Sequence, residues 1–363
     1  MTETLKRLNR RIIPVNAWLT HDQVPWIVAG PCSAESAQQV LATARGLSKC
    51  PYVKAFRAGI WKPRTRPNTI EGVGQVGLEW LKNVKSETGL PTATEVANRE
   101  HVELCLKYGV DILWIGARTT VSPFSVQEIA DALQGTDIPV CVKNPINADL
   151  GLWLGAIERL CSVGIRKLAA IHRGFSTYVE MEFRNEPNWQ IPIELKRLLP
   201  NLPLICDPSH ITGNRRLIEP VSQMALDLGI QGLMIESHIH PEEALSDAGQ
   251  QITPKDLCRM VERLRTRDAG IADRELKRRV ARLRAEISHV DARIIGDLAE
   301  RMKWVEQIGS LKQQHHIPVL QIGRWENLLE DHIAKAQKAG LDPDFIKAIF
   351  QTIHAQAVKR QLQ

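Results

Sequence analysis

Eight short apolar segments, each followed by ten or more residues of helix-compatible sequence, constrain the fold of this chain more than any other feature. Segments that are apolar throughout are typical of parallel strands buried on both faces of a sheet. Eight strand–helix units in about 240 residues match the size of a (β/α)8 TIM barrel, the α/β fold that we predict. The expected strands are Trp26–Ala29, Tyr52–Phe56, Pro91–Glu95, Ile112–Ile115, Pro139–Val142, Leu168–Ile171, Leu204–Cys206 and Leu233–Ile235.

An open, doubly wound sheet is the alternative fold. It is disfavoured because no Gly-x-Gly-x-x-Gly motif follows the first expected strand. Thr253-Pro254 predicts the start of a last barrel helix that ends near Leu264, with threonine as the N-cap and proline at the first helical position. We therefore expect a barrel domain over residues 1–264. The chain has 363 residues, which leaves room for a second domain.

Composition limits the class of protein. With 44% hydrophobic and 24% charged residues, the chain is typical of globular proteins. The net charge of +6 favours anionic ligands, but basic and acidic residues are interleaved, which disfavours nucleic-acid binding. The seven cysteines lie singly, as suits a reducing compartment. No signal peptide and no apolar stretch long enough to cross a bilayer occurs, so we expect a cytoplasmic protein.

Reactive or anion-binding side chains lie at or just after the end of nearly every expected strand. The C-terminal ends of barrel strands converge on one face, where active sites lie. A purely structural barrel would scatter polar residues over both ends, so we expect an active site at this face. These residues are Cys32, Arg57, Glu95, Arg118, Lys143, Arg173, His210 and Glu236.

Two sets of side chains point to chemistry at that face. Cys32, His210, Glu236 and Asp247 form a plausible metal-binding set, whose mixed sulfur, nitrogen and oxygen donors suit Mn²⁺, Fe²⁺, Co²⁺ or Zn²⁺ better than Mg²⁺. Arginine binds phosphate and carboxylate bidentately, and lysine supplies a point charge. The number of cations implies at least two anionic groups, which we expect to be two phosphates and a carboxylate. The cations are Arg57, Lys62, Arg64, Arg118, Lys143 and Arg173.

The C-terminal part of the chain has a different pattern. Residues 265–273 are polar and predict a linker. Apolar residues then recur at three- and four-residue steps from Leu276 to Leu311, which predicts one amphipathic helix of about 38 residues, about 57 Å long. A helix of this length must pair with another chain or fold against later helices. Those helices are expected at Arg324–Ala339 and Asp344–Leu362, which makes residues 274–363 an all-α helical domain.

Three cations on the long helix suggest shared sites. Arg301 and Lys312 lie eleven residues apart, about three turns, and therefore face the same way. Arg284 lies seventeen residues before Arg301 and points about 100° away. It should serve a different site, most simply one on a partner chain.

Seven motifs in the barrel region carry a family resemblance. Together, over about residues 24 to 262, they resemble type I 3-deoxy-D-arabino-heptulosonate 7-phosphate (DAHP) synthase, in its shorter β-type branch. The motifs are Gly30-Pro31-Cys32-Ser33-Ala34-Glu35, Lys62-Pro63-Arg64-Thr65, Gly116-Ala117-Arg118-Thr119-Thr120, Lys143-Asn144, His172-Arg173-Gly174, Asp207-Pro208-Ser209-His210 and Ile235-Glu236-Ser237-His238.

This resemblance implies a metal-dependent condensation of phosphoenolpyruvate with erythrose 4-phosphate, the entry to the shikimate pathway. The metal ion would be bound by Cys32, His210, Glu236 and Asp247. We expect Mn²⁺ in preference to Fe²⁺, Co²⁺ or Zn²⁺. Phosphoenolpyruvate would be held by Arg57, Lys62, Arg118, Lys143 and Arg173, and erythrose 4-phosphate by Lys62, Pro63, Arg64 and Thr65. Glu95, or a metal-bound water near Lys62, would handle protons. The alternative is octulosonate 8-phosphate synthase, which uses arabinose 5-phosphate and carries Lys-Ala-Asn-Arg where this chain has Lys62-Pro63-Arg64-Thr65.

The helical region carries a second resemblance, to the all-helical chorismate mutase family. It rests on Leu283-Arg284, Ala299-Glu300-Arg301, Ser310-Leu311-Lys312, Arg324, Gly340-Leu341-Asp342 and Gln361. In that family two chains intertwine and each site takes one arginine from the partner, which implies a homodimer with Arg284 in that role. Arg301 and Arg324 would bind carboxylates of chorismate or prephenate, and Lys312 and Gln361 would bind the ether oxygen.

The helical region departs from that family at three positions. Gln321, Trp325 and Ala357 stand where some members have Asp, Glu and Ser. The alternative is therefore a dimerising module that senses a ligand without turning it over. Under either interpretation, we expect prephenate or chorismate bound to this domain to inhibit the condensation.

Overall fold

The computed structural model describes residues 3–14, 25–62, 71–178, 181–266, 274–320 and 322–362. The chain divides into two compact units, Met1–Ala269 and Gly270–Gln363. Most of the predicted linker, from residue 267 to 273, lies outside the described residues.

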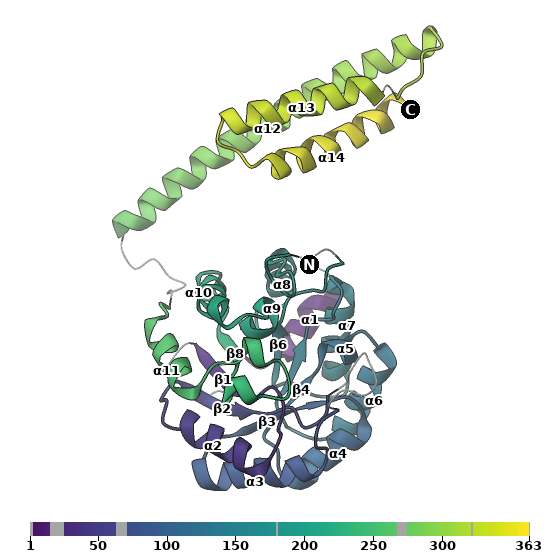
Figure 1. Cartoon of the computed structure of the whole chain (residues 1–363). Helices are drawn as coiled ribbons and strands as arrows, with labels where there is room; N and C mark the ends of the chain where they lie inside the picture. The colour runs from purple at the N-terminus through teal and green to yellow at the C-terminus, as the bar shows by residue number, and fades with distance from the viewer. Residues whose placement is uncertain are drawn as a thin grey trace. The chain divides into compact units, whose positions relative to one another are not determined.

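The first unit is a closed barrel of eight parallel strands in sequence order, with β1 paired to β8. This confirms the predicted fold, and Figure 1 shows the strands enclosed by helices. The strands are β1 (Trp26–Gly30), β2 (Val53–Arg57), β3 (Thr92–Val96), β4 (Ile112–Ile115), β5 (Val140–Lys143), β6 (Leu168–His172), β7 (Leu204–Cys206) and β8 (Gly232–Glu236).

Three strands end on a charged residue that the prediction placed after the strand: Arg57 in β2, Lys143 in β5 and Glu236 in β8. The prediction ended each strand at its last apolar residue, but the backbone ladders continue. Glu236 pairs in register with Gly30 of β1, and Lys143 with Ile171 of β6. These three side chains are therefore positioned by the sheet itself.

The helices around the barrel begin at caps that the sequence supplies. Asn98, Ser122 and Asp149 each accept a hydrogen bond from the backbone N–H three residues later. Thr253 does the same for the helix that begins at Pro254, as predicted. The helices are α1 (Glu3–Arg11), α2 (Ala37–Leu47), α3 (Val76–Thr88), α4 (Arg99–Tyr108), α5 (Ala117–Thr120), α6 (Pro123–Leu133), α7 (Leu150–Ser162), α8 (Gln190–Leu198), α9 (Pro208–Thr212), α10 (Ile218–Asp227) and α11 (Pro254–Arg263).

The apolar core of the barrel has two layers. An inner layer fills the barrel and includes Trp26, Trp114 and Met234. A larger outer layer lies between the strands and the helices and includes the fully buried Trp153. Because the inner layer closes the barrel, polar side chains at the carboxyl ends of the strands stand on an apolar floor.

The second unit consists of three helices, α12 (Arg274–Gln314), α13 (Ile322–Lys338) and α14 (Pro343–Gln361). The long helix has 41 residues, close to the predicted length. Helix α14 packs against both α12 and α13, and Figure 1 shows α14 alongside only the later part of α12. No described helix is both long enough and apolar enough to span a membrane.

The first half of α12 presents apolar side chains to solvent. Leu283 and Ile287 are 57% and 60% exposed, and Val290 and Ile294 are also exposed. Contiguous exposed apolar surface of this kind marks an interaction site. The long helix thus packs against α14 over one half and leaves the other half uncovered within the helical unit.

Gly30 allows β1 and β2 to approach closely at the site-bearing end of the barrel. Its φ is +154°, and a Cβ there would lie 1.9 Å from the backbone oxygen of Arg57. We expect Gly30→Ala to lower the free energy of unfolding by about 3 kcal/mol through strain and overpacking. The matched change Gly155→Ala, in α7 with no atom within 4 Å of the new Cβ, should raise it by up to about 1 kcal/mol. Urea denaturation measures both, and equal stabilities would contradict the close approach.

Candidate active site

Three of the four predicted metal ligands lie together at the carboxyl end of the barrel. Cys32 follows β1, Glu236 ends the neighbouring β8, and Asp247 lies in the loop after β8. Their ligand atoms lie within 4.8 Å of one another. We call these three candidate ligands the metal cluster. Asp247 has a positive φ of 52°, which is uncommon for a residue other than glycine. The cluster therefore depends on barrel closure and on one strained loop residue.

The fourth predicted ligand, His210, faces this cluster from α9. Its Nε2 lies 3.7 Å from Glu236 Oε1, and its Nδ1 lies 2.8 Å from Asp207 Oδ2. A carboxylate on one ring nitrogen of histidine is the usual arrangement that leaves the other nitrogen to bind a metal. Sulfur, imidazole and carboxylate donors at one point fit a transition-metal ion.

Burial, and then the charge of Glu236, raises the pKa of the Cys32 thiol to about 12. The thiol donates a hydrogen bond to Asp247 Oδ2 at 3.2 Å, and Lys62 Nζ donates one to Cys32 Sγ at 3.0 Å. A cysteine must lose its proton to bind a metal ion. The Lys62 ammonium lowers the pKa of the thiol and so favours that loss.

Glu236 is fully buried, and its charge is balanced by its neighbours. Arg57 Nη1 lies 3.2 Å from Glu236 Oε1, and Gln250 Nε2 donates to Glu236 Oε2 at 2.7 Å. Burial would raise the pKa of Glu236, but the positive charges of His210, Arg57 and Lys62 outweigh it and lower the pKa overall. Glu236 is therefore a carboxylate at neutral pH.

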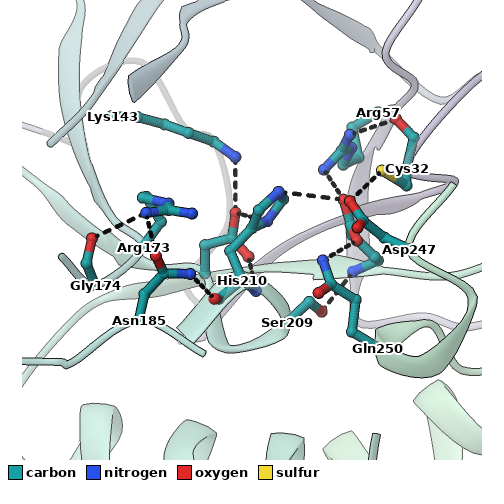
Figure 2. Close-up of polar contacts among 12 residues, drawn as sticks. Cys32, Arg57, Lys143, Arg173, Gly174, Asn185, Ser209, His210, Asp247 and Gln250 are labelled. Carbon is teal, nitrogen blue, oxygen red and sulfur yellow. Dashed lines mark hydrogen bonds and ion pairs between the residues drawn. The ribbon is translucent and has the colours of Figure 1, made fainter. Parts of the chain in front are cut away.

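A cationic cavity of about 270 Å³ adjoins the metal cluster. Three of the five residues predicted to hold phosphoenolpyruvate, Arg118, Lys143 and Arg173, line it, as does Glu95. His210 lines it too, so this residue belongs to both places, and Figure 2 shows it between Lys143 and Arg173 on one side and Cys32 and Asp247 on the other. The full lining is Glu95, Ala117, Arg118, Lys143, Ile146, Arg173, Ser176, Thr177, Arg184, Asn185 and His210.

The other two predicted phosphoenolpyruvate residues, Arg57 and Lys62, lie beside the metal cluster instead. The Arg57 guanidinium lies 4.8 Å from the centre of the Trp114 ring, and Lys143 Nζ lies 5.9 Å from the same ring. One indole thus supports a cation on the cluster side and a cation of the cavity. Pro63, Arg64 and Thr65 lie outside the described residues.

The cavity cations and Glu95 are held in place by buried partners. Lys143 Nζ lies 2.8 Å from Asp207 Oδ2, and Arg173 Nη1 donates to Asn185 Oδ1 at 2.8 Å. Burial lowers the pKa of Arg173 to about 10, which leaves it charged at neutral pH. Trp114 Nε1 donates to Glu95 Oε2 at 3.0 Å.

The sequence analysis missed Arg184, Asn185 and Gln250 as site residues. Arg184 and Asn185 line the cavity, and Gln250 binds Glu236. Arg184 lies twelve residues beyond the end of β6, so the rule that site residues follow strand ends does not find it. No spacing in the sequence groups Arg184 with Gln250, because the two residues lie 66 positions apart.

In the second unit, Arg301 and Gln361 each have a buried polar atom without a hydrogen-bond partner among the described residues, Arg301 Nη1 and Gln361 Oε1. Gly309 brings α14 close to α12, since a Cβ there would lie 3.1 Å from Gln361 Cα. Lys312 Nζ donates to the Val319 carbonyl at 2.7 Å. Arg284 is exposed.

Two of the departures from the mutase pattern can be located. Trp325 stacks on His354, with ring centres 3.9 Å apart, and Ala357 is buried. Burial and then the Arg301 charge lower the pKa of His354. Gln321 and the Arg324 side chain lie outside the described part of the chain.

The fold and site define a (β/α)8 barrel in which a thiol–imidazole–carboxylate cluster adjoins a cationic cavity. Comparison with known families agrees. Residues 14–269 match the sequence model of the DAHP synthetase I family, so the chain belongs to this family. Residues 283–362 match the chorismate mutase type II family.

Individual relatives match the barrel part. A phospho-2-dehydro-3-deoxyheptonate aldolase of Thermotoga maritima is 33% identical over 226 residues, which span 62% of this chain and 64% of the relative. A 2-dehydro-3-deoxyphosphooctonate aldolase of Geobacter sulfurreducens is 25% identical, over 67% of this chain and 92% of the relative. A crystal structure of the Thermotoga maritima DAHP synthase has a TM-score of 0.60 at 29% identity, over 69% of this chain and 75% of that one.

His172 ends β6 directly before Arg173 and is enclosed by aromatic rings, with Trp189 5.0 Å and Phe175 5.7 Å away. Burial lowers the pKa of His172 to about 3. The unfolded chain, with an ordinary histidine pKa near 6.5, binds more protons below that pH, so stability falls as the pH drops. We expect His172 to lower the free energy of unfolding by about 2 kcal/mol as the pH falls from 7 to 5. Urea denaturation at both pH values measures this loss in wild type and in His172→Phe, where it should be smaller. An equal loss of stability in the two proteins would contradict the prediction.

Proposed function

We propose that the barrel condenses phosphoenolpyruvate with erythrose 4-phosphate to give DAHP and phosphate, with a divalent metal ion, Mn²⁺ first, bound by Cys32, His210, Glu236 and Asp247. The observation that carries this proposal is the position of His210, which faces the metal cluster and also lines the cationic cavity. Such a site can hold a metal-activated carbonyl and a phosphorylated anion side by side. Family membership supports the same reaction.

The residues of the site divide the work of the reaction. Arg118, Lys143 and Arg173 would hold the anionic groups of phosphoenolpyruvate, with Arg57 and Lys62 at the cluster side. These fixed cations would align C3 of the enol phosphate with the aldehyde carbon. A bound divalent ion would supply Lewis-acid polarisation of the aldehyde oxygen. Water then adds at C2 and phosphate leaves.

Two further residue assignments complete the proposal. Lys62, Pro63, Arg64 and Thr65 would bind erythrose 4-phosphate. Glu95, which lines the cavity and is oriented by Trp114, would move a proton during the reaction.

Cys32→Ser and His210→Ala are expected to abolish the condensation because each removes a proposed metal ligand. Chorismate rearrangement should persist, because these residues belong to the other compact unit. Coupled assays of both reactions on the full chain measure this. Equal loss of both activities in folded variants would contradict separate sites.

Turnover of arabinose 5-phosphate as fast as that of erythrose 4-phosphate would favour the octulosonate 8-phosphate synthase alternative. The similarity to a 2-dehydro-3-deoxyphosphooctonate aldolase makes this comparison worth testing.

We propose that the helical domain rearranges chorismate to prephenate in a homodimer. Arg301 Nη1 and Gln361 Oε1 are buried and have no hydrogen-bond partner among the described residues, which supports a ligand between α12 and α14. The exposed apolar first half of α12, which carries Arg284, supports pairing with a second chain. Lys312 and Arg324 of the same chain, together with Arg284 of the partner subunit, would complete the site. The reaction is unimolecular, so positioning and charge stabilisation suffice.

Arg301→Ala, Lys312→Ala and Arg284→Ala are each expected to remove mutase activity through loss of about 3 kcal/mol or more of transition-state stabilisation. Mixing Arg284→Ala chains with Arg301→Ala chains should restore part of it, because a mixed dimer holds one site with both arginines. Chorismate consumption before and after mixing measures the recovery. Failure to recover, with subunit exchange demonstrated, would contradict the shared site. Absence of turnover in wild type would favour a non-catalytic sensing domain.

We also propose that prephenate bound to the helical domain inhibits the condensation. Such coupling typically amounts to about 1–3 kcal/mol. The full-length Arg301→Ala chain should condense its substrates normally and lose inhibition by prephenate. DAHP assays with increasing prephenate test this, and inhibition of that variant equal to wild type would place the inhibitory site elsewhere.

We also propose that the protein is located in the cytoplasm. All seven cysteines are free thiols, six of them buried, as expected in a reducing compartment.

A further inference from the structure

Arg184, in the loop between β6 and α8, connects the metal cluster with the cationic cavity. Its Nη1 donates to Asp247 Oδ1 at 2.9 Å and to Gln250 Oε1 at 2.7 Å. Gln250 Nε2 in turn donates to Glu236 Oε2 at 2.7 Å. One guanidinium nitrogen is therefore bound directly to one candidate metal ligand and, through one amide, to another.

These contacts use Asp247 Oδ1 and Glu236 Oε2, so the second oxygen of each carboxylate faces the cluster, where Glu236 Oε1 also pairs with Arg57 Nη1 at 3.2 Å. Asp247 Oδ2 faces Cys32 Sγ at 3.2 Å, and Glu236 Oε1 faces His210 Nε2 at 3.7 Å. Asp247 also has the positive φ of 52° that a non-glycine residue keeps only when its surroundings hold it. The contact with Arg184 supplies part of that restraint.

Arg184 is itself held against the helix that carries His210. Its backbone N–H donates to the Thr212 carbonyl at 3.4 Å, and that of Asn185 to the Ile211 carbonyl at 3.0 Å. Gly213 ends α9 with a φ of +62°, and a Cβ there would lie 2.8 Å from Arg184 Cβ. The lack of a side chain at residue 213 makes room for the aliphatic part of Arg184.

Arg184 also lines the cavity together with Arg118, Lys143 and Arg173, and its side chain is 47% exposed. Both contacts with the cluster leave from Nη1, whereas a guanidinium has five N–H donors. Among the described residues only Nη1 of this guanidinium makes a hydrogen bond, so its Nε and Nη2 donors could bind an anion, and a guanidinium suits phosphate.

We propose that Arg184 is a positioning residue that fixes Asp247 and, through Gln250, Glu236 for metal binding, and that the same guanidinium binds a phosphate group in the cavity. The inference rests on the proposed metal-dependent condensation.

The test uses the full-length chain, stripped of metal with a chelator and titrated with Co²⁺, whose bond to the Cys32 thiolate gives a charge-transfer absorption band. Calorimetry measures the binding of phosphoenolpyruvate separately. Arg184→Met should weaken Co²⁺ binding about 10- to 100-fold, the usual loss for a residue that orients a metal ligand. It should also weaken phosphoenolpyruvate binding about tenfold, as expected for the loss of one charged hydrogen bond.

Two further variants separate orientation from charge. Removing the guanidinium also removes a positive charge, which by itself would favour metal binding. Arg184→Lys keeps the charge without the planar fork, so it should weaken Co²⁺ binding and largely retain that of phosphoenolpyruvate. Gln250→Leu should weaken Co²⁺ binding alone. Arg197→Met, which removes an exposed arginine of α8 paired with Glu194, is the matched control and should change neither affinity.

Wild-type affinities in Arg184→Met would overturn the inference and leave the proposed function standing. Absence of the thiolate–Co²⁺ band in wild type would overturn the metal site and the inference together. Thermal unfolding checks that each variant is folded; if Arg184→Met is not, Arg184→Lys and Gln250→Leu decide the inference, and normal Co²⁺ affinity in both overturns it.

Discussion

The burial of opposite charges together at the carboxyl end of the barrel is the constraint on which the rest of the site depends. Glu236 and Asp207 have no exposed side-chain surface, and a buried carboxylate costs several kcal/mol unless it is paired. Arg57 and Lys143 supply those pairs and lie near the same Trp114 ring, so packing holds the cations as well as charge. The charged groups are therefore in place before any ligand arrives, as electrostatic preorganisation requires.

The sequence predicted the barrel well because a strand buried on both faces leaves a continuous apolar run. It placed the ends of β2, β5 and β8 too early, since a charged residue that continues a ladder looks locally like the start of a loop. Cys32 and Glu236 could be grouped because barrel closure brings β1 beside β8. Arg184 and Gln250 could not be grouped with them from the sequence. Arg184 contacts Asp247 and Gln250, 63 and 66 residues away, and Gln250 contacts Glu236 at a buried strand end. No local sequence pattern encodes such side-chain contacts.

Both units bury polar atoms that have no hydrogen-bond partner among the described residues, and in the barrel these include Arg57 Nε and both ring nitrogens of His172. In the barrel, buried charges find partners within the protein, and the cavity beside them is left for anions. In the helical unit, Arg301 Nη1 and Gln361 Oε1 are buried without a hydrogen-bond partner among the described residues. Each such atom costs about 1–3 kcal/mol. A ligand that satisfied both atoms would recover that free energy on binding, so the open pair favours occupancy.

The uncovered first half of α12 has a consequence for dilute solutions. A helical segment of about 20 residues without packing is marginal in water, and its apolar residues are satisfied only by another surface. Once a second chain provides that surface, the order of this segment follows mass action and falls on dilution. The barrel has a complete core within one chain and does not depend on dilution in this way. The ratio of the two activities would then change with enzyme concentration, even at saturating levels of every substrate.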